Sequence, residues 1–230
     1  MGRCVFDTAP CMPTPLDLPP LQFSRATAPA PLQMVLRQVE LVHPGLRPFT
    51  DAVGALSSVA ATVNRRHRDV SFWKDEVGAI CLLGPLTHYL LSLPRPSGDV
   101  EDQTDDAQLA GEILRLTSLL VLSDLKRRSS LSCADMEPLS RKLIPLAMRP
   151  LTDAMGGIVD LHLWSLITCS LLLPSATRIP ILPVIWALAS ARGISTTTAI
   201  LELAESLLWF ETVVEAEKIK LEMQLADRLA

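Results

Sequence analysis

Aromatic side chains are scarce in this chain. They make up 4% of its 230 residues, with one tyrosine and five phenylalanines. β-sheets are enriched in aromatic and β-branched residues, whereas leucine and alanine, which abound here, favour helices. The hydrophobic fraction of 49% is sufficient for a sizeable core, and the length suits one domain. We therefore expect an all-α fold, a single multi-helix domain whose helices pack in an array.

The chain also lacks an excess of positive charge. Its formal net charge is -4 and its pI is about 5.6, so no overall positive field draws it to a phosphate backbone. Direct nucleic-acid binding is not expected. Two short basic runs, at 65–68 and 126–128, lie at the ends of predicted helices. Cations stabilise the C-terminal end of a helix dipole, and we favour that role over a nuclear-localisation or nucleic-acid patch.

The common signatures of catalysis are missing as well. The chain has no glycine loop with a lysine placed to meet a phosphate, no G-x-S-x-G turn and no H-E-x-x-H helix. No His or Cys pair has the spacing of metal ligands. We expect no catalytic, cofactor-binding or metal site. The alternative is a helical enzyme of a metabolic pathway with an unrecognised pocket, for which Asp160, His162 and Cys169 are the first residues to test.

Cysteine is present in an odd number and is widely spread, which favours free thiols in a reducing compartment over a disulfide framework. The five residues are Cys4, Cys11, Cys81, Cys133 and Cys169. No charged start followed by an apolar run marks a secretion signal, because Pro10, Pro13 and Pro15 interrupt the first residues.

A long hydrophobic run is also lacking, although the mean hydropathy is +0.31. The uncharged run from Leu161 ends before Pro174 and has about 13 residues, whereas a helix that spans a bilayer needs roughly 20. We interpret this run as a buried core helix. A membrane-associated helical protein remains a second alternative.

Proline and charge divide the chain. Seven prolines lie within residues 1–31, which we interpret as a proline-rich, disordered arm ahead of a helical domain at 32–230. An acidic loop is expected at about 94–106, where turn formers precede five acidic residues. Helices are predicted at 32–42, 49–67, from Trp73 to Leu93, 109–128, 135–148, within 150–174, at 184–191 and from Ser195 onward.

Three of these helices carry informative apolar patterns. One face of the third is marked by Trp73, Val77, Ile80 and Leu83, and a buried stripe of the fourth by Leu109, Ile113, Leu116 and Leu120. In the last helix, apolar residues extend over several sides from Leu201 through Trp209 and Phe210, which indicates a buried first half. Beyond Glu215 the same helix becomes charged, as on a protein surface. The four tryptophans are interpreted as core anchors.

The order of these segments resembles the regulatory domain of fungal zinc-cluster transcription factors, the fungal-specific transcription factor domain, in the subgroup often found beside metabolic gene clusters. The resemblance covers most of Leu32 to Leu225. Its anchors are Ile113 to Arg128, Arg141 to Leu146, Leu163-Trp164 and Leu207-Leu208-Trp209. All are scaffold segments, so the match concerns fold and lineage.

The resemblance implies a regulatory and dimerisation module of the nucleus, with cytoplasmic occurrence also open. It implies a protein partner or a homodimer, and a small-molecule effector. In that family a separate DNA-binding head holds two zinc ions with six closely spaced cysteines. Only Cys4 and Cys11 occur in the arm, and no C-x-x-C pair exists, so such a head would require an upstream exon. We expect a transcription-factor-like regulator, without its own zinc-cluster domain, that acts through other proteins or a small effector.

Overall fold

The structure is a computed structural model that describes residues 26–94, 106–129, 131, 136–149, 157–213 and 215–227. All regular elements in these ranges are helices, which confirms the all-α prediction. The α-helices are α1 (Ala30–Val42), α2 (Arg47–Arg66), α3 (Val70–Lys74), α4 (Glu76–Ser92), α5 (Asp106–Arg128), α6 (Met136–Ala147), α7 (Gly157–Leu172), α8 (Ser175–Arg178), α9 (Leu182–Ala191), α10 (Thr197–Leu207) and α11 (Glu215–Ala226), with a short 3-10 helix η1 (Pro44–Leu46).

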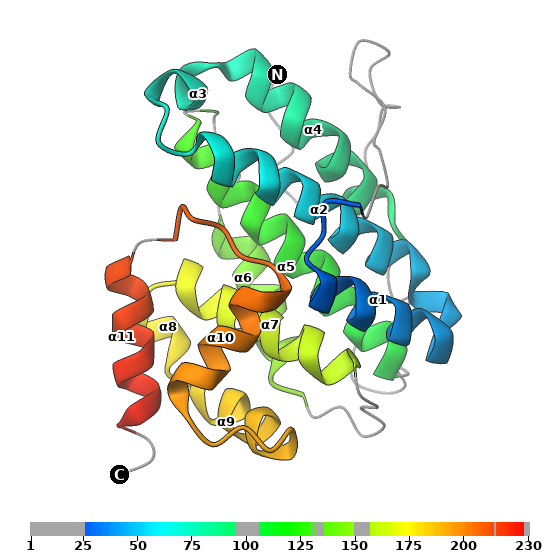
Figure 1. The fold of residues 1–230 in the computed structure, drawn as a ribbon, viewed down its shortest axis with the longest axis vertical. Helices are drawn as coiled ribbons and strands as arrows, with labels where there is room; N and C mark the ends of the chain where they lie inside the picture. The colour runs from blue at the N-terminus through cyan, green and yellow to red at the C-terminus, as the bar shows by residue number, and fades with distance from the viewer. Residues whose placement is uncertain are drawn as a thin grey trace.

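Helix α5 is the centre of the packing. It contacts α2, α4, α6 and α7 (Figure 1). The predicted stripe from Leu109 to Leu120 is buried, but burial extends to every side chain from Leu109 to Leu125. Small serine and threonine side chains on the other faces allow this close approach. The one large charged side chain at its middle, Arg115, is paired with Glu112.

Helix α7 is the second buried helix, as its uninterrupted apolar sequence predicts. It packs between α5 and a layer formed by α1, α9 and α10 (Figure 1). Trp164 is 1% exposed and is the largest fully buried side chain, which confirms its interpretation as a core anchor. A Cβ on Gly157 would lie 3.0 Å from the carbonyl oxygen of Val35. Glycine therefore allows the start of α7 to approach α1.

The third predicted helix is two helices. Asp75 interrupts it and caps α4 by accepting a hydrogen bond from the backbone N–H of Gly78. The predicted face is wrong, since Val77 is 72% exposed and only Leu83 of that face is buried. Within α4 the buried face instead follows Ala79, Leu83, Leu86 and Leu90. Helix α4 then continues through Pro85.

The last predicted helix is also two helices. α10 ends at Leu207, and residues 208–213 are not helical before α11 begins at Glu215. The prediction of one long helix from Ser195 is therefore wrong. Three hydrogen bonds from other helices hold the break. Trp164 Nε1 donates to the carbonyl of Leu208, and Asn64 donates to the carbonyl of Trp209 and accepts from the N–H of Glu211.

The helix predicted at 32–42 is present as α1. Helix α1 begins at Ala30, with Pro31 in its first turn, where a missing N–H costs no helical bond. Ala28 is already buried. Residues 1–25 of the predicted arm and residues 95–105 of the predicted acidic loop lie outside the described residues. In the described part of the chain, no helix combines the length and the apolarity needed to cross a bilayer.

Candidate functional site

The residues of the enzyme alternative each have another partner. Asp160 accepts two hydrogen bonds from the guanidinium of Arg192, at 2.7 and 3.0 Å. His162 lies with its Nε2 2.8 Å from the carbonyl oxygen of Ala147. A carbonyl only accepts, so Nε2 carries the proton and Nδ1 does not. Burial lowers the pKa of His162, which keeps the ring neutral.

Cys169 is on the same helix but is not activated. Its thiol is buried in α7, and burial raises its pKa to about 12. Seven residues separate it from His162, which places it two helical turns, about 10.5 Å, along the axis. A thiolate is the nucleophilic form of cysteine. The structure therefore does not bring Asp160, His162 and Cys169 together as a nucleophilic group.

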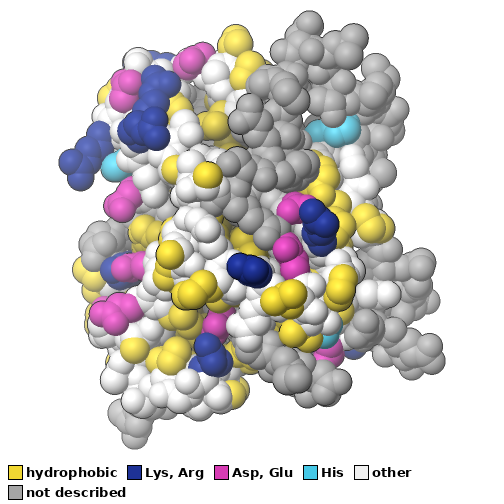
Figure 2. All heavy atoms as spheres, turned by 45° about the vertical axis from the view of Figure 1, so that its right-hand side comes forward, with side chains coloured by type: hydrophobic (Ala, Val, Ile, Leu, Met, Phe, Trp, Pro, Cys, Tyr) yellow, Lys and Arg dark blue, Asp and Glu magenta, His cyan; other side chains and the backbone are white. Residues whose placement is uncertain are grey.

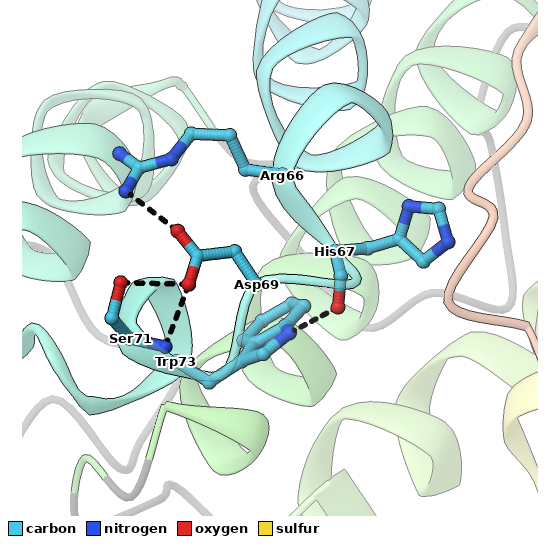
Figure 3. Close-up of polar contacts among 5 residues, drawn as sticks. All are labelled: Arg66, His67, Asp69, Ser71 and Trp73. Atoms are coloured by element: carbon cyan, nitrogen blue, oxygen red, sulfur yellow. Dashed lines mark hydrogen bonds and ion pairs between the residues drawn. The ribbon is translucent and has the colours of Figure 1, made fainter.

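The basic run at 65–68 lies at the turn between α2 and α3, and Figure 3 shows how it is held. Arg66 pairs with Asp69 at 3.4 Å and lies 4.8 Å from the centre of the Phe72 ring. Asp69 in turn caps α3, because it accepts from both the N–H and the hydroxyl of Ser71. These hydrogen bonds and the nearby Arg66 hold the pKa of Asp69 below its ordinary value. Trp73 donates to the carbonyl of His67. This run therefore shapes a helix end.

Figure 2 shows how charged side chains are distributed over one face of the molecule. In Figure 2, lysine and arginine side chains gather at one end of that face, and elsewhere basic and acidic side chains are interspersed. Arg65, Arg68 and Lys74 are exposed at the α2–α3 end, with Asp75 and Glu76 beside them. The described residues of that face therefore form no long basic stripe of the kind that follows a nucleic-acid backbone.

The second basic run leads to a cleft. It has a volume of about 270 Å³ and lies where the ends of α5 and α7 meet α8 and α11. We call it the arginine cleft. Its polar side chains are Asp124, Arg127, Arg128, Ser175, Arg178 and Glu217. Three arginines and two carboxylates give it a positive balance.

On the α5 side of the cleft, one carboxylate holds two arginines. Asp124 is 4% exposed and accepts from Arg127 at 2.6 Å and from Arg128 at 2.7 Å. These spacings, i to i+3 and i to i+4, bring the charges together on one face of the helix. The predicted helix-end role of Arg127 and Arg128 is present, and both side chains also line the cleft.

On the opposite side, Arg178 is almost completely buried, with 1% of its side chain exposed. Its Nη2 donates to the hydroxyl of Ser175 at 3.3 Å and to the carboxylate of Glu217. Its Nε and Nη1 are buried and have no hydrogen-bond partner among the described residues. Buried guanidinium donors normally all have acceptors. Arg178 therefore has unused capacity to bind an anion.

Glu217 closes this side of the cleft from the first turn of α11. Its carboxylate accepts from Lys220 at 2.7 Å and from Arg178. The hydrogen bond from Lys220, and next that from Arg178, hold the pKa of Glu217 below its ordinary value. The carboxylate is therefore ionised near neutral pH. Glu217 pairs with two cations and its side chain is 30% exposed. Its ion pair with Arg178 is therefore partly solvated and contributes little to stability.

The remaining wall of the cleft is apolar. Leu171, Leu172 and Val213 line it, and the same three residues also line a smaller neighbouring cavity of about 20 Å³. That cavity is bounded further by Trp209 and Phe210 of the break between α10 and α11. An apolar wall facing a few charged groups is typical of sites that bind small molecules.

Sequence reasoning did not identify this cleft. In the sequence, Arg178 follows the apolar run that begins at Leu161, and Glu217 lies in the charged segment beyond Glu215. One signal was available: Arg178 is the only charged residue between Leu161 and Ala191. Such a charge needs a partner when it is buried. Its partner, 39 positions further along the chain, could not be read from spacing.

A scan of protein-family models, a search of curated proteins and a search of solved structures found no match to this chain. Among the described residues, no group of three or more His, Cys, Asp or Glu side chains is placed to hold a metal ion. The arginine cleft is therefore the candidate site on geometry alone.

Proposed function

We propose that this chain is a transcription-factor-like regulatory protein that acts by binding a small effector and a protein partner or a second copy of itself. We place it in the nucleus, with cytoplasmic occurrence open, and assign it to the control of a fungal metabolic gene cluster. The single observation that supports effector binding is the arginine cleft, which combines an apolar wall with the incompletely paired Arg178.

The position of the cleft supports a regulatory role. A ligand there would contact α5, the central helix, and α11, the last one, together. A ligand changes the behaviour of a protein only if it binds one arrangement of it better than another. Helix α11 is the element that such a ligand would affect, because the pairing of Glu217 with Arg178 is one of its attachments.

The resemblance to fungal regulatory domains supports the transcriptional part of the proposal. We assign the chain a binding role and no catalytic one, because Asp160, His162 and Cys169 are occupied or inert. The acidic charge balance supports action through proteins that contact DNA, with no DNA contact by the chain itself.

A tethering experiment tests the proposal. The chain is fused to the DNA-binding domain of an unrelated transcription factor and expressed in yeast with a reporter gene under that domain's sites. We expect reporter output to change relative to the DNA-binding domain alone. Equal output from the two proteins would contradict a transcriptional role.

A second experiment tests the absence of direct DNA contact. The purified chain is titrated with a labelled promoter fragment at several salt concentrations. We expect no binding in the micromolar range. Tight binding that weakens steeply as salt rises would contradict this part of the proposal, because that slope reports phosphate contacts.

A further inference from the structure

We propose that the effector of the arginine cleft is a small carboxylate with an apolar body, and that it binds Arg178 by displacing Glu217. This inference deepens the proposed function and rests on it for the regulatory meaning of the ligand. The binding itself is a property of the cleft and is measured separately.

The chemistry of the head group follows from Arg178. Among the described residues its one anionic partner is the carboxylate of Glu217, which accepts from a single nitrogen, Nη2. A guanidinium presents paired donors that match the two oxygens of a carboxylate, and such two-point contacts are stronger than single ones. A ligand carboxylate that replaces Glu217 can accept from Nη2 and from a second nitrogen that now lacks a partner. Such a two-point contact would add one hydrogen bond to the single one that Glu217 makes with Arg178.

The remaining guanidinium groups of the cleft add long-range attraction. Arg127 and Arg128 lie on the opposite wall, and both are already paired with Asp124. With Arg178 they leave a positive balance of one charge over Asp124 and Glu217. A ligand with a single negative charge neutralises that balance. A ligand with several negative charges would face the two carboxylates as well.

The body of the ligand follows from the apolar wall and the volume. Leu171, Leu172 and Val213 add apolar lining to the charged groups of the cleft. The cleft volume of about 270 Å³ lies just below the range of about 300–1,000 Å³ typical of drug-sized ligands. The fitting molecule is therefore small, with a short aromatic or branched aliphatic body.

Glu217 acts as an internal competitor, and this makes the inference testable. Replacing it by glutamine keeps the size of the side chain and removes its charge. The loss of a competing ion pair should strengthen binding of an external carboxylate by about threefold to fivefold. A residue that only stabilised the fold would weaken binding or leave it unchanged when altered.

Calorimetric titration of the full chain is the test, with 4-phenylbutyrate as the probe. The uncharged 4-phenylbutyramide is the matched control for the head group, acetate for the apolar body and inorganic phosphate for general anion binding. We expect 4-phenylbutyrate to bind, and the amide, acetate and phosphate to bind at least tenfold more weakly. Glu217→Gln should bind 4-phenylbutyrate more tightly. Glu222→Gln, on the same helix but bonded to Thr198, should behave as the unaltered protein.

Two results would overturn the inference. One is equal binding of the acid and the amide, or of phosphate and 4-phenylbutyrate. The other is no gain in affinity for Glu217→Gln. Because this variant keeps the buried Arg178, the result is informative even if a variant that lacks the arginine, such as Arg178→Met, fails to fold. A cleft that binds carboxylates in a chain without transcriptional effect would sustain this inference and refute the proposed function. A transcriptional effect without carboxylate binding would do the reverse.

Discussion

His162 is a buried base whose ring nitrogen Nε2 donates to the carbonyl of Ala147. Burial lowers its pKa below the ordinary value of 6.5. Below about pH 6.5 the unfolded chain therefore takes up a proton that the folded chain does not, and stability falls as the pH decreases toward the lowered folded pKa. Between these two pKa values the free energy of unfolding falls by at most about 1.4 kcal/mol per pH unit, because one proton is involved.

We predict that His162→Gln, which keeps a donor group and removes the titration, will flatten this dependence. The free energy of unfolding of both proteins is measured by denaturant titration at pH 7.5, 6.5 and 5.5. A loss of stability of equal slope in the two proteins would assign the acid sensitivity to other groups.

The buried Glu112–Arg115 ion pair is expected to be costly to break. Arg115 is fully buried, and Glu112 accepts from its Nε and Nη2 at 2.8 and 2.6 Å. Removing one partner of a buried pair leaves an uncompensated charge, so Glu112→Leu should cost about 3–5 kcal/mol. The double variant Glu112→Leu, Arg115→Met should recover much of that loss, because no charge remains. Thermal and denaturant unfolding measure both, and a double variant less stable than the single one would contradict the account.

Individual site residues differ in how well the sequence predicts them. The apolar residues around Cys169 and Trp164 predict that both lie in the core, and both are buried. The role of Arg178 was missed because it depends on Glu217, which follows it by 39 positions and lies on another helix. Local spacing predicts burial, whereas a pairing between distant helices exists only once the helices are packed.

The break between α10 and α11 is the clearest case at the scale of elements. Apolar spacing favours a helix through Leu208 and Phe210, and nothing in those residues forbids one. The extended backbone is stabilised instead by Asn64 and Trp164, which are 145 and 44 positions away from the carbonyls they bind. The stripe of α5 was predicted correctly because it depends only on residues within the helix.

We predict that Asn64→Ala will destabilise the protein by about 1–3 kcal/mol, because it removes two hydrogen bonds to the backbone of the break. Asn64→Asp should cost less. It keeps the acceptor for the N–H of Glu211 but loses the donor to Trp209. Denaturant unfolding of the three proteins provides the order. An Asn64→Ala variant as stable as the unaltered protein would mean that the break is held by other contacts.

At the level of the whole molecule, two buried helices, α5 and α7, organise the packing (Figure 1). Their C-terminal ends line the arginine cleft. Helix α8 supplies Arg178 to it, and α11 closes it with Glu217. Side chains that are far apart in the sequence, Asp124 and Glu217 among them, meet there. The buried helices α5 and α7 and the last helix, α11, thus all line the arginine cleft.

The proposed link between the arginine cleft and transcription is measured with the tethered chain. Reporter output of the tethered chain is recorded against the concentration of added 4-phenylbutyrate for three proteins: unaltered, Glu217→Gln and Glu222→Gln. We expect Glu217→Gln to shift the half-maximal concentration about threefold to fivefold lower, and Glu222→Gln to leave it in place. Coincident curves for all three proteins, or none that respond to the acid, would contradict the account.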